Sequence, residues 1–220
     1  MTLLRMARET PSDRDRYVDF LRGFSILVVV FGHWLIAVVT WEGGQVAGTN
    51  ALEEIRGLWL ATWVLQVMPL FFFVGGFSNL RSWRAAVRRG GGYSLFLHGR
   101  LARMMRPTVV FLGIGLVVTV TLDALNVADN VVFPASELIT RPLWFLGVYA
   151  AIVVAVPLTA RWVESPRRTL TSWLVVIIVV DLVRWKLAPS LGWVNMLLVW
   201  GWLHQLGYSL PALRGVNRPC

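Results

Sequence analysis

The sequence predicts an all-α protein, a polytopic bundle of about six transmembrane helices. Hydrophobic residues make up 56% of the 220 residues and charged residues 15%, whereas soluble domains carry roughly 25% charged residues. The hydrophobic residues collect in blocks of about 20, the length that an α-helix needs to cross the hydrocarbon layer. No block shows the polar and apolar alternation of a barrel strand. Together these observations predict membrane-spanning helices.

Each predicted span is long enough to satisfy its own backbone hydrogen bonds in lipid as a helix. The first block follows a long polar lead-in, and no small-residue cleavage site follows it. We therefore interpret it as a retained helix and not as a cleaved signal peptide. In chain order the six segments are Phe20–Trp41, Leu58–Ser78, Pro107–Leu125, Leu143–Ala160, Thr171–Lys186 and Trp193–Leu210.

Arginine residues predict the orientation of these spans. Cytoplasmic loops carry an excess of Lys and Arg, and most of the 21 basic residues lie on one side when the N-terminus is placed inside the cell. Six spans then leave both termini cytoplasmic. Residues 1–19 form a cytoplasmic N-terminal segment and residues 79–106 a basic cytoplasmic loop. Within that loop, Ser82–Arg89 and Ser94–Arg106 are two candidate amphipathic pieces.

The charge and cysteine content exclude several classes of protein. A net charge of +9 would suggest nucleic acid in a soluble protein, but here the basic residues lie between apolar blocks. We expect a lipid bilayer as the partner, in the bacterial inner membrane, and no nucleic acid. Cys220 is the single cysteine, so an internal disulfide framework and a cysteine metal site are excluded within one chain, and no metal site is predicted.

The first span carries a narrow polar stripe. Arg22 and His33 are eleven positions apart, which places them within about 20° of one face of a helix, and Asp19 lies about 40° to the other side of His33. An ionisable group deep in a membrane faces a cavity or a partner, and histidine suits the removal of a hydroxyl proton near neutral pH. Two alternatives remain: that His33 only bonds another helix, and that Asp19–Arg22 is a surface ion pair.

The order of four stretches resembles the acyltransferase-3 family of membrane proteins. That family has an arginine or lysine and a histidine separated by ten residues in its first span, as Arg22 and His33 are. One departure is Gly75-Gly76, where family members usually have Ser-Gly. The stretches that carry the resemblance are Asp19-Phe20-Leu21-Arg22-Gly23 with Gly32-His33, Pro69–Phe77, Arg100–Pro107 and Leu143-Trp144-Phe145-Leu146.

The resemblance implies an enzyme, a membrane O-acyltransferase. Such enzymes move an acyl group, often acetyl, from acyl-CoA to a hydroxyl of a cell-surface polysaccharide, glycolipid, peptidoglycan or related metabolite. The resemblance implies that His33 is a general base or acyl-handling residue and that Arg22 is a donor-side or orienting residue. Asp19, on the same polar stripe, is the third candidate catalytic residue. The resemblance implies acyl-CoA as the donor substrate, with no bound cofactor. Because a thioester carries its own activation, no metal is required.

Three arginines are candidate contacts for the phosphates of the coenzyme. Arg100, Arg103 and Arg106 lie on the predicted cytoplasmic side, and guanidinium groups offer bidentate hydrogen bonds to phosphate. The alternative is that these residues only set the topology, as basic residues do in any membrane protein.

Two other functions stay open from the sequence. Family members typically have about ten spans, so the resemblance implies that residues 1–220 are a single domain that is C-terminally incomplete. A non-catalytic, truncated acyltransferase remnant is therefore one alternative. The other is a polytopic transporter or flippase-like protein that uses the same ionisable residues as proton relays. Matching halves with broken helices would favour a transporter, and the sequence shows none.

Other polar residues within the spans have simpler interpretations. Asp181 and Arg184 are three positions apart and are expected to pair with each other. His204-Gln205 would line the same cavity as His33 or form hydrogen bonds between helices. His98 lies in the basic loop and is expected to be solvated.

Overall fold

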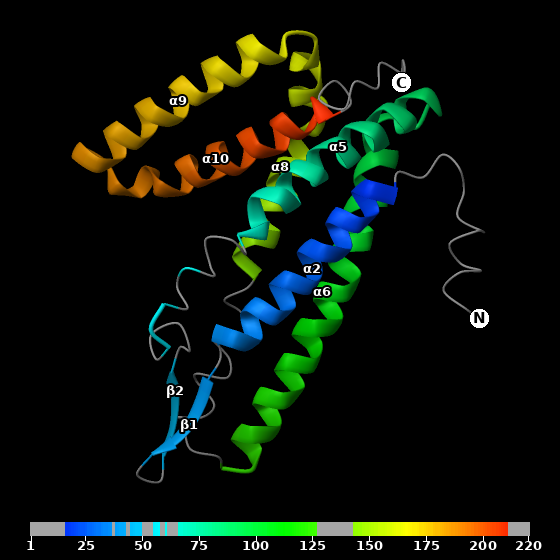
Figure 1. The fold of residues 1–220 in the computed structure, drawn as a ribbon. Coiled ribbons are helices and arrows are strands. Elements are labelled where there is room, and N and C mark those ends of the chain that lie inside the picture. The colour runs from blue at the N-terminus through cyan, green and yellow to red at the C-terminus, as the bar shows by residue number, and fades with distance from the viewer. Residues whose placement is uncertain are drawn as a thin grey trace.

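Helices dominate the chain in the computed structural model, which confirms the predicted helical class (Figure 1). A short β-hairpin that the sequence did not predict is the exception. The side chains of Arg22, of residues 33–36 and of both strands lie outside the description. The structure describes residues 16–36, 38–42, 45–49, 55–57, 60, 66–126 and 143–210.

Helix α2 (Arg16–Ile36) covers most of the first predicted span, Phe20–Trp41. The prediction that this span continues to Trp41 is wrong. The chain leaves the helix and forms β1 (Val38–Glu42), which pairs antiparallel with β2 (Gln45–Thr49). The valine and threonine residues of β1 are β-branched, and such residues fit a strand better than a helix.

Helices α5 (Val67–Arg88) and α6 (Gly92–Ala124) meet at a tight turn. The segment predicted as a basic loop, residues 79–106, is therefore helical almost throughout: one candidate amphipathic piece ends α5 and the other begins α6. Gly90 and Gly92 supply the turn with φ angles of +74° and +53°, which only glycine adopts without strain. The helices continue because arginine, leucine, alanine and methionine are good helix formers.

The second half of the described chain contains three helices joined by short 3₁₀ segments. Helix α8 (Trp144–Thr159) runs into η2 (Ala160–Glu164). Helix α9 (Pro166–Lys186) begins with proline at its first turn, where the missing N–H costs nothing. Segment η3 (Pro189–Leu191) then leads into α10 (Gly192–Gly207).

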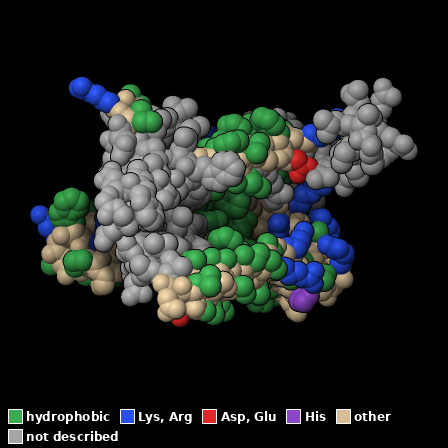
Figure 2. Space-filling view, turned by 90° about the horizontal axis from the view of Figure 1, so that it is seen from below, with side chains coloured by type: hydrophobic (Ala, Val, Ile, Leu, Met, Phe, Trp, Pro, Cys, Tyr) green, Lys and Arg blue, Asp and Glu red, His purple; other side chains and the backbone are tan. Residues whose placement is uncertain are grey.

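Two helices are long and apolar enough to cross a membrane within the described residues: Gly92–Ala124 and Trp144–Glu164. Most of the large apolar side chains of α6 after Pro107 are exposed. In Figure 2 a band of hydrophobic side chains ends at a cluster of Lys and Arg. An exposed apolar surface of this extent requires lipid. The other four predicted spans lie in or near described helices and stay a prediction.

The tightest helix pair joins α5 to α10. Phe72 stacks on Trp200 with ring centroids 4.7 Å apart, and Gly76 lies against the backbone of His204. The contact therefore advances by four residues on each helix, so the two helices run in the same direction. A Cβ at Gly76 would overlap the His204 carbonyl, and one at Gly207 would overlap the Phe73 carbonyl. Glycine at both positions allows the backbones to approach.

Six helix ends lie toward one end of the molecule. These are the N-terminal ends of α2, α6 and α9 and the C-terminal ends of α5, α8 and α10, toward the top and upper right of Figure 1. The arginine-rich turn between α5 and α6 lies there, as does η2 with Arg161. We call this the arginine-rich end.

Candidate functional site

Helix α2 carries the three positions predicted to form the catalytic stripe. The helix is continuous from Arg16 to Ile36, so its register places positions 22 and 33 within about 20° of each other around the axis. Val18 and Ser25 are buried on α2, and Val18 packs against α5. Position 22 lies between them along the helix. Asp19 is partly buried, and the side chains of the other two lie outside the described residues, so their roles stay a prediction.

Arg100 joins α6 to α5. Its Nη2 donates to the backbone carbonyl of Ser78 and lies 2.8 Å from Ser78 Oγ and 2.9 Å from Ser82 Oγ. Arg103 and Arg106 are exposed instead, and Arg103 donates from Nε to the carbonyl of Gly99 in its own helix. Of the three arginines predicted to bind phosphates, two therefore present exposed side chains, in the N-terminal half of α6.

A buried polar cluster joins α5, α8 and α10 in the middle of the bundle. Asn79 is fully buried and His204 is 1% exposed. The Asn79 Nδ2 lies 3.0 Å from His204 Nε2 and donates to the Tyr149 hydroxyl at 3.1 Å. Each of the three residues comes from a different helix, so these hydrogen bonds hold the three helices in register.

A second set of hydrogen bonds continues this cluster toward the arginine-rich end. Thr159 Oγ1 lies 2.9 Å from the Tyr208 hydroxyl, and Gln205 Nε2 donates to the Thr159 carbonyl at 3.3 Å. The Tyr208 ring packs edge-on against the His204 ring, with centroids 5.4 Å apart. We call Asn79, Tyr149, Thr159, His204, Gln205 and Tyr208 the buried polar cluster.

The sequence identified only part of this cluster. His204 and Gln205 were expected to line a cavity or to bond between helices, and the described contacts are of the second kind. The other four members, Asn79, Tyr149, Thr159 and Tyr208, were missed. Asn79 is a polar residue one helical turn after Gly75-Gly76, a signal that becomes informative only once α5 and α10 are known to pack there.

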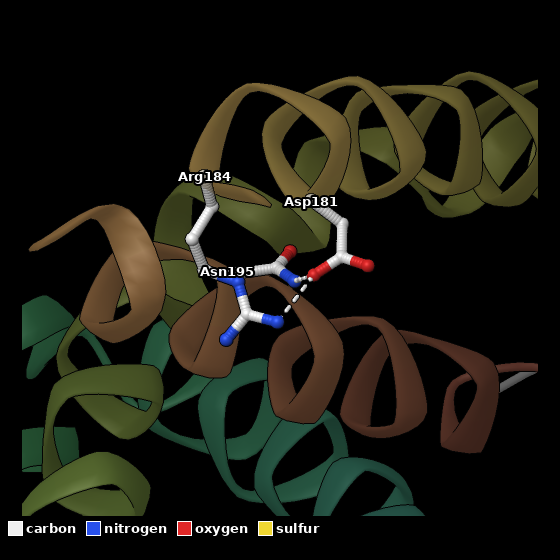
Figure 3. Close-up of polar contacts among 3 residues, drawn as sticks. All are labelled: Asp181, Arg184 and Asn195. Carbon is white, nitrogen blue, oxygen red and sulfur yellow. Dashed lines mark hydrogen bonds and ion pairs between the residues drawn. The ribbon is translucent and has the colours of Figure 1, made fainter. Parts of the chain in front are cut away.

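The expected pair of Asp181 and Arg184 is confirmed. Arg184 Nη2 lies 2.9 Å from Asp181 Oδ1, and Asn195 Nδ2 of α10 donates to the same oxygen at 2.9 Å (Figure 3). The carboxylate therefore joins α9 to α10 near their connection. His98 is exposed, as expected for a solvated residue.

No group of three or more metal-ligating His, Cys, Asp or Glu side chains occurs in the part of the chain that the structure describes. The described polar contacts between side chains instead involve amide, hydroxyl, imidazole, guanidinium and carboxylate groups.

The described helices and their exposed apolar surface first define a class: a membrane-embedded helical protein. Its sequence matches the acyltransferase-3 family model, described as an acyltransferase domain, over residues 15–213. The chain belongs to the acyltransferase-3 family, as its sequence motifs indicated. Neither the curated proteins nor the solved structures contain a match to the chain.

Proposed function

We propose that this protein is an O-acyltransferase of the bacterial inner membrane. It would move an acyl group, most simply acetyl, from acyl-CoA to a hydroxyl of a cell-surface glycan, glycolipid or related metabolite. The observation that carries the proposal is the acyltransferase-domain match, which extends over almost the whole chain. The apolar surface of α6 and α8 supports a membrane location.

The proposed topology has six spans, with both termini in the cytoplasm. The arrangement in Figure 1 supports it, because the helix ends that the arginine distribution assigns to the cytoplasm lie toward one end. That end carries the turn between α5 and α6, with Arg88 and Arg89, and also η2. A cytoplasmic arginine-rich end would meet acyl-CoA, which is made in the cytoplasm, and would attract its phosphates.

His33 is the proposed general base of the reaction. The acceptor hydroxyl loses its proton to the imidazole as its oxygen attacks the thioester carbonyl. The carbon–sulfur bond then breaks, and the departing coenzyme thiolate takes up a proton, which leaves an ester and free coenzyme A. Arg22, on the same face of α2 by its register, would orient the donor, and Asp19 would hold that guanidinium. A positioned base typically contributes about 10²–10⁴-fold to such a step.

The predicted phosphate contacts divide into two groups in this proposal. Arg103 and Arg106 are exposed and would attract the coenzyme to the arginine-rich end. Arg100 is hydrogen-bonded to two serines of α5, which favours a role in holding α6 against α5 near the site.

Replacing His33 with alanine is expected to reduce acyl transfer by about 10²–10⁴-fold, because the acceptor hydroxyl would lose its base. Membrane insertion should be unaffected, since one histidine is a small part of the insertion energy. The measurement uses radiolabelled acetyl-CoA added to membranes that contain the protein, with label counted in the glycan and lipid fractions. His98→Ala is the matched control, because His98 is exposed and distant in sequence from α2.

Normal transfer by His33→Ala would exclude the proposed base. If the unaltered protein transfers no label, two outcomes separate the alternatives. Uptake of a labelled glycolipid into vesicles without any acyl donor would support a transporter. No activity in either assay would support a non-catalytic protein.

A further inference from the structure

A pocket of about 610 Å³ opens where α8 passes through η2 into α9. Its volume lies within the range of small-molecule and cofactor sites, about 300–1,000 Å³. The sequence did not single out this place, and none of the residues proposed above for catalysis or phosphate binding lines it. Its lining comes mainly from η2 and the first half of α9, with Thr159 from α8 and Leu198 from α10.

The mouth of the pocket is predominantly positive. Arg161 and Arg168 line it from η2 and α9, against one carboxylate, that of Glu164. Neither guanidinium forms an ion pair within the described parts of the chain. The first turn of α9, which begins at Pro166, adds backbone N–H groups and the positive end of the helix dipole. These groups together favour a phosphate-bearing anion.

Four other residues of the pocket lining are aromatic or apolar. Trp162 and Trp173 meet edge to face, with ring centroids 6.0 Å apart and an interplanar angle of 88°. Trp173 is held in place because its ring packs directly over Gly201 of α10. Val176 and Leu198 complete the apolar part of the lining. Indole faces of this kind stack on flat heteroaromatic rings.

One residue of the pocket lining also belongs to the buried polar cluster. Thr159 lines the pocket, and the same residue bonds to Tyr208 and Gln205. The pocket and the buried polar cluster therefore share one residue, Thr159.

We propose that this pocket holds the nucleotide end of the coenzyme-A thioester, with its phosphates at Arg161 and Arg168 and its adenine against Trp162. This inference rests on the proposed acyltransferase function and adds the location of the donor. Coenzyme A combines several phosphate charges with a flat adenine ring, which matches the cationic mouth and the indole wall. An anionic phospholipid shares the phosphate but has no flat ring.

The test measures binding of coenzyme A to the purified protein in nanodiscs of neutral phosphatidylcholine, by isothermal titration calorimetry. Arg168→Gln is expected to weaken binding about tenfold, because it removes a charge-assisted hydrogen bond to phosphate. Trp162→Leu should weaken the binding of coenzyme A but leave the binding of inorganic phosphate unaffected. Adenosine 3′,5′-bisphosphate should compete with coenzyme A, and phosphopantetheine should compete poorly.

Arg167→Gln is the matched control, since Arg167 is the neighbour of Arg168 on α9 but does not line the pocket. It should bind coenzyme A as the unaltered protein does. Equal losses for both variants would mean that general charge, and not this pocket, attracts the ligand, and would overturn the inference. If Arg103→Gln lowers the affinity for coenzyme A and Arg168→Gln does not, the donor binds at α6, and this result would also overturn the inference.

A lipid comparison separates the two sources of phosphate. Native mass spectrometry can compare phosphatidylglycerol retained by the unaltered protein and by Arg168→Gln. If Arg168→Gln loses retained lipid but binds coenzyme A normally, the pocket is a lipid site and the inference is wrong.

Failure of this inference can be told apart from failure of the proposed function. If coenzyme A binding depends on Arg168 but no acyl transfer occurs, the pocket is supported as a coenzyme A site and the proposed acyltransferase function is ruled out. If Arg168→Gln transfers acyl groups with an unchanged KM for acetyl-CoA, the acyltransferase function is supported and the pocket is ruled out as the donor site.

Discussion

At the scale of single residues, the buried hydrogen bond between Asn79 and His204 is the contact with the clearest energetic meaning. Both side chains are almost fully buried, and a buried polar group without a partner costs free energy. Hydrogen bonds between transmembrane helices are worth on average about 0.6 kcal/mol and at most about 1.7 kcal/mol. The pair therefore specifies which helices meet more than it stabilises them.

Asn79→Ala is expected to lower the free energy of unfolding by about 1–2 kcal/mol, because His204 and Tyr149 both lose a partner. Thermal unfolding in detergent, followed by circular dichroism, measures the change. A double-mutant cycle with His204→Ala should show that the two losses are not additive.

Thr121→Val provides the comparison for this experiment, since Thr121 is exposed on α6 and, within the described residues, its hydroxyl bonds only to the Val117 carbonyl of the same helix. It should change stability by less than about 0.5 kcal/mol. Additive effects of Asn79→Ala and His204→Ala would show that the bond does not couple α5 to α10.

At the scale of elements, the close approach of α5 and α10 depends on glycine. Gly76 and Gly207 each face the backbone of the other helix, and backbone atoms cannot move aside as a flexible side chain can. The same approach positions Asn79 opposite His204, one turn along α5. Packing of the two helices and formation of the buried polar cluster are thus linked.

Gly76→Ala is expected to destabilise the protein by about 1–3 kcal/mol, the usual cost of overpacking, since the new methyl group overlaps the His204 carbonyl. Thermal unfolding and the accessibility of Asn79→Cys to a thiol reagent would report separation of the helices.

Gly113→Ala is the control for this change. Gly113 lies on α6, and no atom of the described part of the chain outside that helix lies within 4 Å of where its Cβ would be. Alanine there should leave stability unchanged or raise it by up to about 1 kcal/mol through helix propensity. Gly76→Ala with unaltered stability would mean that α5 and α10 do not pack as described.

At the scale of the whole molecule, charge and hydrophobicity lie in different places. The apolar surface extends along α6 and α8. In Figure 2 a cluster of Lys and Arg lies at one end of a hydrophobic band, and Arg88 and Arg89 lie where α5 ends. Basic segments remain on the cytoplasmic side during insertion. The molecule should therefore sit with that end in the cytoplasm.

Cysteine labelling in intact cells tests this orientation. In a Cys220→Ser background, Asp123→Cys at the far end of α6 should react with a membrane-impermeant maleimide added outside. Arg89→Cys, in the turn between α5 and α6, should react only after the membrane is permeabilised. Both positions are exposed, so burial does not confuse the comparison. Labelling of Arg89→Cys in intact cells would invert the proposed topology.

Much of the local structure could be predicted, and the errors have physical reasons. The blocks beginning at Leu143, Thr171 and Trp193 correspond to helices within a few residues, because length and hydrophobicity decide where a membrane helix forms. The basic segment around Arg100 was predicted as a loop because charge usually marks the membrane boundary. Charge does not end a helix, however, and α6 continues through it.

By itself, the sequence determined the membrane class, the predominance of helices, the family and the spacing of Arg22 and His33 along one helix. These depend on composition, block length and local periodicity, which are properties of a linear chain. Only the tertiary structure decided that Asn79 meets His204, that Arg100 meets Ser78, and that Trp162 and Arg168 share a pocket. Such contacts depend on which helices become neighbours and how closely they pack, and no local pattern encodes that choice.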